Sequence, residues 1–177
     1  MQKVVLTFGL IGGALIAVMM ALTLPFTAQI GFDRGVIVGY TTMVLAFLMV
    51  YFGVRSYRDT AAGGRITFGR AFIVGSLITA VITMCYVLTW QVMYYGFMPD
   101  FVEKYTAFAL EKARLGGATE ADLARQAKEL DEFWTRYKNP LVNIAFTFLE
   151  PLPVGLVFTF VTAGVLGRKR ATAGAGV

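Results

Sequence analysis

The stretch Phe148-Leu149-Glu150-Pro151-Leu152-Pro153 lies inside the last long apolar run of the chain, from about Leu141 to Leu166. That run is longer than the ~20 apolar residues that a helix needs to cross a bilayer. Its one ionisable group, Glu150, falls near mid-membrane depth, and the prolines that follow it remove backbone donors. The sequence therefore predicts a membrane helix that is interrupted beside a single carboxyl group.

The composition places the chain in the membrane class. Of its 177 residues, 57% are hydrophobic and only 15% are charged, whereas soluble domains average about 25% charged residues. The net charge of +5 comes from basic residues that flank apolar runs, so nucleic acid is excluded as a partner. The chain has no histidine and shows no serine, cysteine or metal-ligand constellation. We therefore expect neither an enzyme nor a cofactor or metal site.

Four apolar runs predict an all-α integral membrane protein with one membrane domain over residues 1–177. The predicted spans are residues 4–24, 35–54, 71–95 and 141–166. Residues 99–139 are more polar, with seven basic and eight acidic side chains. Apolar residues at intervals of three and four in this segment indicate two amphipathic helices, and Thr119 with Asp122 resembles a capping box. The prediction is an extracytoplasmic helical hairpin between the third and fourth spans, with residues 171–177 as a mobile tail.

Glycines recur at four-residue spacing in and around the first two spans. They are Gly9 and Gly13, and then Gly31, Gly35 and Gly39. Such spacing lets helices approach one another closely. We expect these glycines to serve packing within the chain rather than a dimer interface.

Basic residues decide the predicted orientation. Lys3, the arginines between the second and third spans and three cations near the carboxyl terminus make eight, and the other side of the membrane would also carry eight. The first set is clustered at the ends of spans with little acid nearby, so we expect both termini in the cytoplasm. The interspan arginines are also expected to contact anionic lipid, the alternative being that they only determine topology; they are Arg55, Arg58, Arg65 and Arg70.

Two groups of motifs resemble a known family. The first is Arg55-Ser56-Tyr57-Arg58-Asp59 followed by Gly63-Gly64 and Ile66-Thr67-Phe68-Gly69, and the second runs from Asn139-Pro140 through Phe148-Leu149-Glu150-Pro151. Together they resemble the central and closing motifs of a bacterial four-helix membrane family, domain of unknown function 4199, over essentially the whole chain. The resemblance implies four helices and a location in the bacterial inner membrane. It implies no activity.

Glu150 is the centre of a predicted polar site within the membrane. A carboxylate at the bilayer centre costs at least ~2.5 kcal/mol to insert, so we expect Glu150 to be neutral or hydrogen-bonded by groups at similar depth. The group is either a proton- or cation-responsive site or a buried contact that fixes helix packing. The predicted site comprises Glu150, Pro151, Pro153, Asn143, Thr42, Thr83 and Tyr86.

Two functions are compatible with these features. The first is a non-enzymatic inner-membrane protein that contacts lipids and acts as a scaffold or accessory subunit for a membrane protein partner. The alternative is a small transporter or channel in which Glu150 is the responsive group, and because four helices are few for a complete pathway, it would need a homo-oligomer. A water-accessible cavity that reaches Glu150 would favour transport, and a dry packed core would favour the scaffold.

Overall fold

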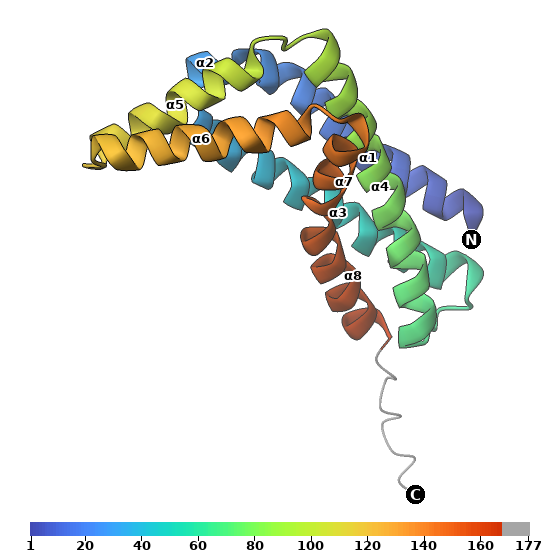
Figure 1. The fold of residues 1–177 in the computed structure, drawn as a ribbon. Coiled ribbons are helices and arrows are strands. Elements are labelled where there is room, and N and C mark those ends of the chain that lie inside the picture. Colours follow the sequence, from blue (N-terminus) through green and yellow to red (C-terminus); the bar gives the residue numbers. More distant parts are fainter. Residues whose placement is uncertain (168–177) are drawn as a thin grey trace, which may run out of the picture.

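The computed structural model describes residues 1–167, and this part of the chain consists of helices joined by short turns (Figure 1). Four segments are long and apolar enough to cross a membrane: Gln2–Phe26, Phe32–Ala61, Phe68–Gly96 and Pro140–Leu166. The all-α prediction is confirmed for the described residues, and the predicted tail lies outside them. The elements are α1 (Gln2–Thr23), η1 (Leu24–Phe26), α2 (Thr27–Ile30), α3 (Phe32–Ala61), α4 (Phe68–Gly96), α5 (Phe101–Leu115), α6 (Glu120–Tyr137), α7 (Pro140–Leu149) and α8 (Leu152–Leu166).

Helix α4 is at the centre of the packing, since it contacts α1, α3, α7 and α8. The core between these helices is fully buried at Phe47, Val50, Ile78 and Ile82. The outward faces of the same helices carry large apolar side chains that are more than half exposed, among them Leu10, Ile37, Leu88 and Val161. An apolar surface of this extent is rare in soluble monomers. Together with the four long apolar helices, it indicates a membrane protein.

Glycines allow α1 to lie directly against α4. A Cβ atom at Gly9 would come within 2.7 Å of the Val81 side chain, and one at Gly13 within 2.5 Å of the Cys85 sulfur. The expected packing role is therefore confirmed for these two glycines. A Cβ atom at Gly31 or Gly39 would meet nothing within 4 Å, so these two have no such role within the chain.

Helix α3 extends beyond the predicted span of residues 35–54 and ends at Ala61. The predicted span left Arg55 and Arg58 between two spans, whereas in the structure both residues lie on α3. Asp59 lies 2.7 Å from the Arg58 guanidinium and 3.8 Å from that of Arg55, and the Arg55–Asp59 pair has the four-residue spacing that supports a helix. Tyr57, between the arginines, is buried and anchors this extension to the core.

The turn between α3 and α4 covers only residues 62–67. Gly63 and Gly64 adopt φ angles of 64° and 80° there, which glycine reaches without a steric penalty. Helix α4 begins where Thr67 caps it, because the backbone N–H of Arg70 donates to the Thr67 hydroxyl at 3.4 Å. Such a cap satisfies one of the backbone N–H groups that the first turn of a helix leaves without a partner.

Helices α5 and α6 form an arm that projects from one end of the bundle (Figure 1). The predicted capping box is present at the start of α6, where the backbone N–H of Asp122 donates to the Thr119 hydroxyl at 3.2 Å and the Thr119 N–H donates to the Asp122 carboxylate at 3.3 Å. The aromatic rings of the two helices pack on each other, with the Tyr105 and Trp134 centroids 5.6 Å apart. Tyr105 also packs edge-on against Phe32 at the start of α3, at 5.5 Å. Aromatic contacts thus fix the base of the arm to the bundle.

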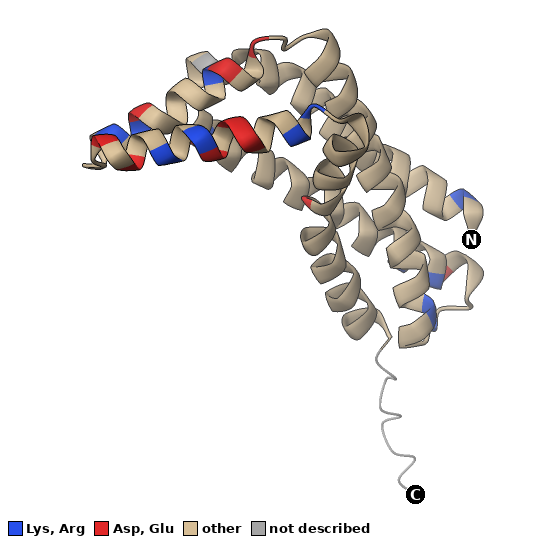
Figure 2. Cartoon of the chain, in the orientation of Figure 1, with Lys and Arg blue, Asp and Glu red and all other residues tan. Residues whose placement is uncertain are grey.

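Charge separates the two ends of the molecule from its middle. Charged side chains gather on the α5–α6 arm and at the opposite end of the bundle, while the helices between them are largely uncharged (Figure 2). The amino terminus, the turn between α3 and α4 and the end of α8 all lie at the end away from the arm (Figure 1). The close approach of Gly167 to Phe68 at the start of α4 agrees with this arrangement.

Candidate functional site

The last span is interrupted where the prolines predicted. Helix α7 ends at Leu149, α8 begins at Leu152, and Glu150 and Pro151 form the junction. Because proline has no N–H, the carbonyls of Thr147 and Leu149 lack the donor that a continuous helix would supply four residues later. Glu150 therefore lies in the interior of the span, beside two carbonyls that lack their usual helical donor.

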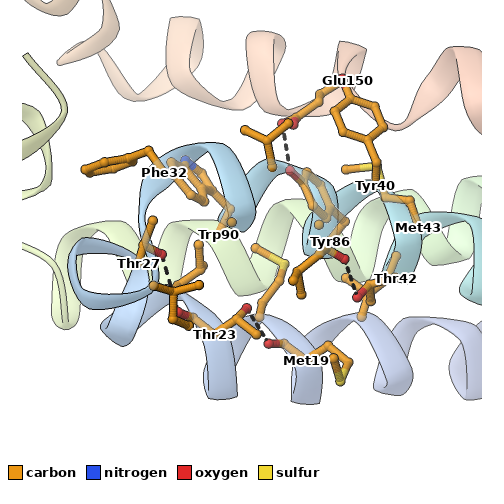
Figure 3. Close-up of a pocket in the computed structure, with 18 of the residues that line it drawn as sticks. Met19, Thr23, Thr27, Phe32, Tyr40, Thr42, Met43, Tyr86, Trp90 and Glu150 are labelled. Carbon is orange, nitrogen blue, oxygen red and sulfur yellow. Dashed lines mark hydrogen bonds between the residues drawn. The ribbon is translucent and has the colours of Figure 1, made fainter. Parts of the chain in front are cut away.

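The Glu150 carboxyl group is held by Tyr86 of α4. The Tyr86 hydroxyl donates to Oε2 of Glu150 at 2.6 Å (Figure 3). Tyr86 is only 7% exposed, whereas Glu150 is exposed and has no ion pair with a lysine or arginine within residues 1–167. A carboxyl group with one donor keeps further acceptor capacity. Glu150 can therefore accept a hydrogen bond from a second molecule.

A cavity of about 220 Å³ ends at this tyrosine–glutamate pair (Figure 3). It is lined by the end of α1, the start of α3 and the last part of α4, and Phe101 and Tyr105 of α5 contribute to its wall. The cavity exists because α3 packs against α8 but scarcely contacts α7, so that the first turns of α3 diverge from the last span. Its walls are predominantly apolar.

The structure brings together some of the predicted site residues and separates others. Thr42 lines the cavity, but its hydroxyl donates to the Val38 carbonyl at 2.8 Å rather than to Glu150. Thr83 is 1% exposed, does not line the cavity, and its hydroxyl has no hydrogen-bond partner among the described residues. Pro151 is buried at the junction and Pro153 is exposed.

Asn143 belongs to a second buried polar cluster, together with Gln91, Thr147 and Tyr137. It precedes Glu150 by two helical turns, roughly 10 Å along the axis, which is too far for the two side chains to share a site. Its Oδ1 accepts from Gln91 Nε2 at 2.7 Å, and the Thr147 hydroxyl lies 3.3 Å from this Oδ1 and donates to the Asn143 backbone carbonyl at 2.8 Å. The Tyr137 hydroxyl lies 3.4 Å from that of Thr147, so the cluster joins α4, α6 and α7.

This second cluster was not predicted from the sequence. A signal for it was available, because Asn143 and Thr147 are polar, four residues apart and set in an apolar run. Burial raises the pKa of the Tyr137 phenol above its usual value, which keeps this hydroxyl neutral. The cluster is therefore a neutral hydrogen-bond network that connects the arm to the bundle.

The four arginines that were expected to contact lipid have separate surroundings. Arg55 and Arg58 pair with Asp59, and Arg70 Nε donates to the Tyr57 hydroxyl at 3.1 Å. Arg65 is exposed in the turn. No group of three or more histidine, cysteine, aspartate or glutamate side chains could hold a metal ion in the described part of the chain.

Comparison with protein families gives a match. A family model described as Protein of unknown function (DUF4199) matches residues 7–168. The chain belongs to this family. The DUF4199 match covers both groups of motifs on which the resemblance was based, and it confirms that resemblance. No curated protein and no solved structure matches the chain significantly.

Proposed function

We propose that this DUF4199 protein is a non-enzymatic protein of the bacterial inner membrane that binds an amphipathic molecule, and that it is a lipid-contacting scaffold or accessory subunit for a membrane protein partner. The observation that carries the proposal is the cavity of about 220 Å³ that ends at Glu150 and Tyr86. An engineered cavity of about 150 Å³ in another protein is large enough to hold benzene. Apolar walls with a few placed polar groups are typical of sites for small organic ligands.

The packed core next to the cavity supports ligand binding rather than transport. Phe47 and Val50 of α3 and Ile78 and Ile82 of α4 are fully buried between the cavity and the opposite end of the bundle. A route across the membrane would require this packed core to separate. A cavity that does not continue through this core suits a protein that holds a ligand in place.

A small transporter or channel assembled from several copies is the second candidate. It is favoured by the fact that the cavity reaches Glu150, which would then be the proton- or cation-responsive group. Two or more copies would be needed, since the packed core of one chain leaves no continuous path. Proton-linked flux in liposomes that is lost in Glu150→Gln would favour this candidate over the scaffold.

Trp90 provides a direct test of binding, because it lines the cavity. The chain has two tryptophans, so a Trp134→Phe variant leaves Trp90 as the only reporter. A bromine atom quenches tryptophan fluorescence on contact. We expect 6-bromohexan-1-ol to quench Trp90 in a saturable manner when this variant is reconstituted into lipid nanodiscs.

Two glycine variants, both made in the Trp134→Phe background, control this experiment. Gly39 lines the cavity and has open space where a side chain would begin, so Gly39→Leu should fill it and weaken binding by roughly tenfold or more. Gly164→Leu adds the same side chain to α8, also into open space but outside the cavity, and should not change the affinity. Quenching that rises linearly and equally in all variants would mean partitioning into lipid and would contradict the proposal.

The proposed orientation places both termini in the cytoplasm and the α5–α6 arm on the opposite side. It is supported by the position of the clustered basic residues at the end of the bundle away from the arm. In a Cys85→Ala background, Leu115→Cys would put a thiol at the tip of the arm, where Leu115 is 81% exposed. We expect this thiol to react with a membrane-impermeant reagent in spheroplasts.

The control for orientation is Ala61→Cys in the same background. Ala61 is exposed at the end of α3, so its thiol should react only after lysis. The opposite labelling pattern would show that the topology is inverted.

A further inference from the structure

The cavity has a charge bias that indicates which amphipathic molecules it accepts. Among the described residues that line it, Glu150 is the only carboxyl group, and none is a lysine or an arginine. Within residues 1–167, the one hydrogen bond to this carboxyl group comes from Tyr86 and uses Oε2. A cationic ligand would therefore meet the Glu150 carboxyl group and no lysine or arginine that repels it.

The threonine hydroxyls of the cavity add little that would attract an anion, and its remaining lining donors are neutral groups, among them Trp90 Nε1, which has no hydrogen-bond partner within residues 1–167. The hydroxyls of Thr23, Thr27 and Thr42 all donate to backbone carbonyls, at 2.7, 3.3 and 2.8 Å. Their protons are thus committed within the protein, and their remaining lone pairs can only accept. The threonine side of the cavity consequently favours a ligand that donates hydrogen bonds.

Aromatic rings form much of the remaining wall. Figure 3 shows Phe32, Tyr40, Tyr86 and Trp90 around the cavity, with Glu150 at one end. Phe101 of α5 packs edge-on against Trp90, with ring centroids 5.4 Å apart. The faces of such rings attract a cation that lies within about 6 Å of the ring centre. The aromatic rings and the Glu150 carboxylate therefore both favour a cationic ligand.

We propose that the cavity binds a small lipophilic cation, an alkylammonium or arylalkylammonium, whose ammonium group meets the Glu150 carboxylate and whose apolar body lies among the aromatic rings. This inference rests on the proposed function, because it names the class of molecule that the cavity takes. A volume of about 220 Å³ suits one short chain or one ring and is too small for a whole two-chain lipid. An anionic amphiphile of the same size would be repelled by Glu150.

Three probes that share one tail test the inference. They are 6-bromohexylammonium, 6-bromohexan-1-ol and 6-bromohexanoate, titrated into the Trp134→Phe protein in nanodiscs of uncharged lipid while Trp90 fluorescence is recorded. Protein-free nanodiscs give the partitioning of each probe. We expect the ammonium compound to bind on the order of tenfold to a hundredfold more tightly than the alcohol, and the carboxylate to bind most weakly.

Glu150→Gln should remove most of the preference for the ammonium compound over the alcohol, because the charge is removed while the shape is kept and only the smaller attraction of the aromatic rings is left. Glu120→Gln makes the same change at an exposed position on α6, outside the cavity, and should keep the parent ratio. An ammonium probe that binds no better than the alcohol, or a ratio that survives in Glu150→Gln, would overturn the inference and leave the proposed function standing. Absence of saturable binding for all three probes would overturn both.

Discussion

Replacing Gly155 by valine should destabilise the protein by about 3 kcal/mol or more, the upper end of the cost of overpacking a core. Gly155 lies in the first turn of α8, where this helix crosses α3 and α4. A Cβ atom there would come within 2.5 Å of the Thr79 methyl group and 2.8 Å of the Phe47 ring. Phe47 is fully buried and Thr79 is 5% exposed, so neither can move aside without disturbing the core.

The matched control is Gly164→Val on the same helix. A Cβ atom at Gly164 would meet nothing within 4 Å, so this change should alter stability by no more than about 0.5 kcal/mol, as for most surface substitutions. Thermal unfolding of the purified variants in one detergent, followed by circular dichroism, measures both. Equal melting temperatures for the two variants would show that the close approach of α8 to α3 and α4 at Gly155 is not needed for stability.

The Asn143–Gln91 hydrogen bond should contribute strongly to stability, and in a non-additive way. Asn143→Leu keeps the approximate volume but leaves the Gln91 amide without the acceptor that lies 2.7 Å away. A polar group left without its hydrogen-bond partner in the interior costs roughly 1–3 kcal/mol, and Gln91→Leu should cost a similar amount because Oδ1 of the fully buried Asn143 loses its shortest hydrogen bond.

The double variant Asn143→Leu/Gln91→Leu distinguishes this explanation from simple loss of packing. Replacing both partners by apolar groups removes the unsatisfied atoms, and such replacements can be nearly neutral. The double variant should therefore be less destabilised than the sum of the single variants by about 1–2 kcal/mol in a double-mutant cycle. Additive effects would mean that the amides do not depend on each other.

Local signals in the sequence were sufficient for the break in the last span and for two helix caps, although not for the end of α3 at Ala61. Pro151 and Pro153 remove donors from the backbone wherever they stand, so the break after Leu149 follows from their chemistry alone. Thr67 and the pair Thr119 and Asp122 cap helices through groups only three residues apart. Such contacts need no knowledge of the tertiary structure.

The composition of the candidate site depended on contacts that local patterns do not encode. Tyr86 was among several polar residues at similar predicted depth, and only the packing of α7 on α4 shows that it binds Glu150. Thr42 satisfies its own helix instead, and Asn143 finds Gln91. The cavity itself arises because α3 diverges from α7, which is a relation between distant segments that periodicity cannot reveal.

The extension of α3 to Ala61 has a consequence for how the protein meets the membrane boundary. A helix of 30 residues is about 45 Å long, whereas the hydrocarbon layer is about 30 Å thick. We expect this mismatch to be accommodated by tilt and by the last two turns of α3 extending into the headgroup layer. Arg55 and Arg58 lie on these two turns, about one turn apart. The geometry of the helix, rather than a flexible loop, therefore fixes the positions of the two side chains along the helix axis.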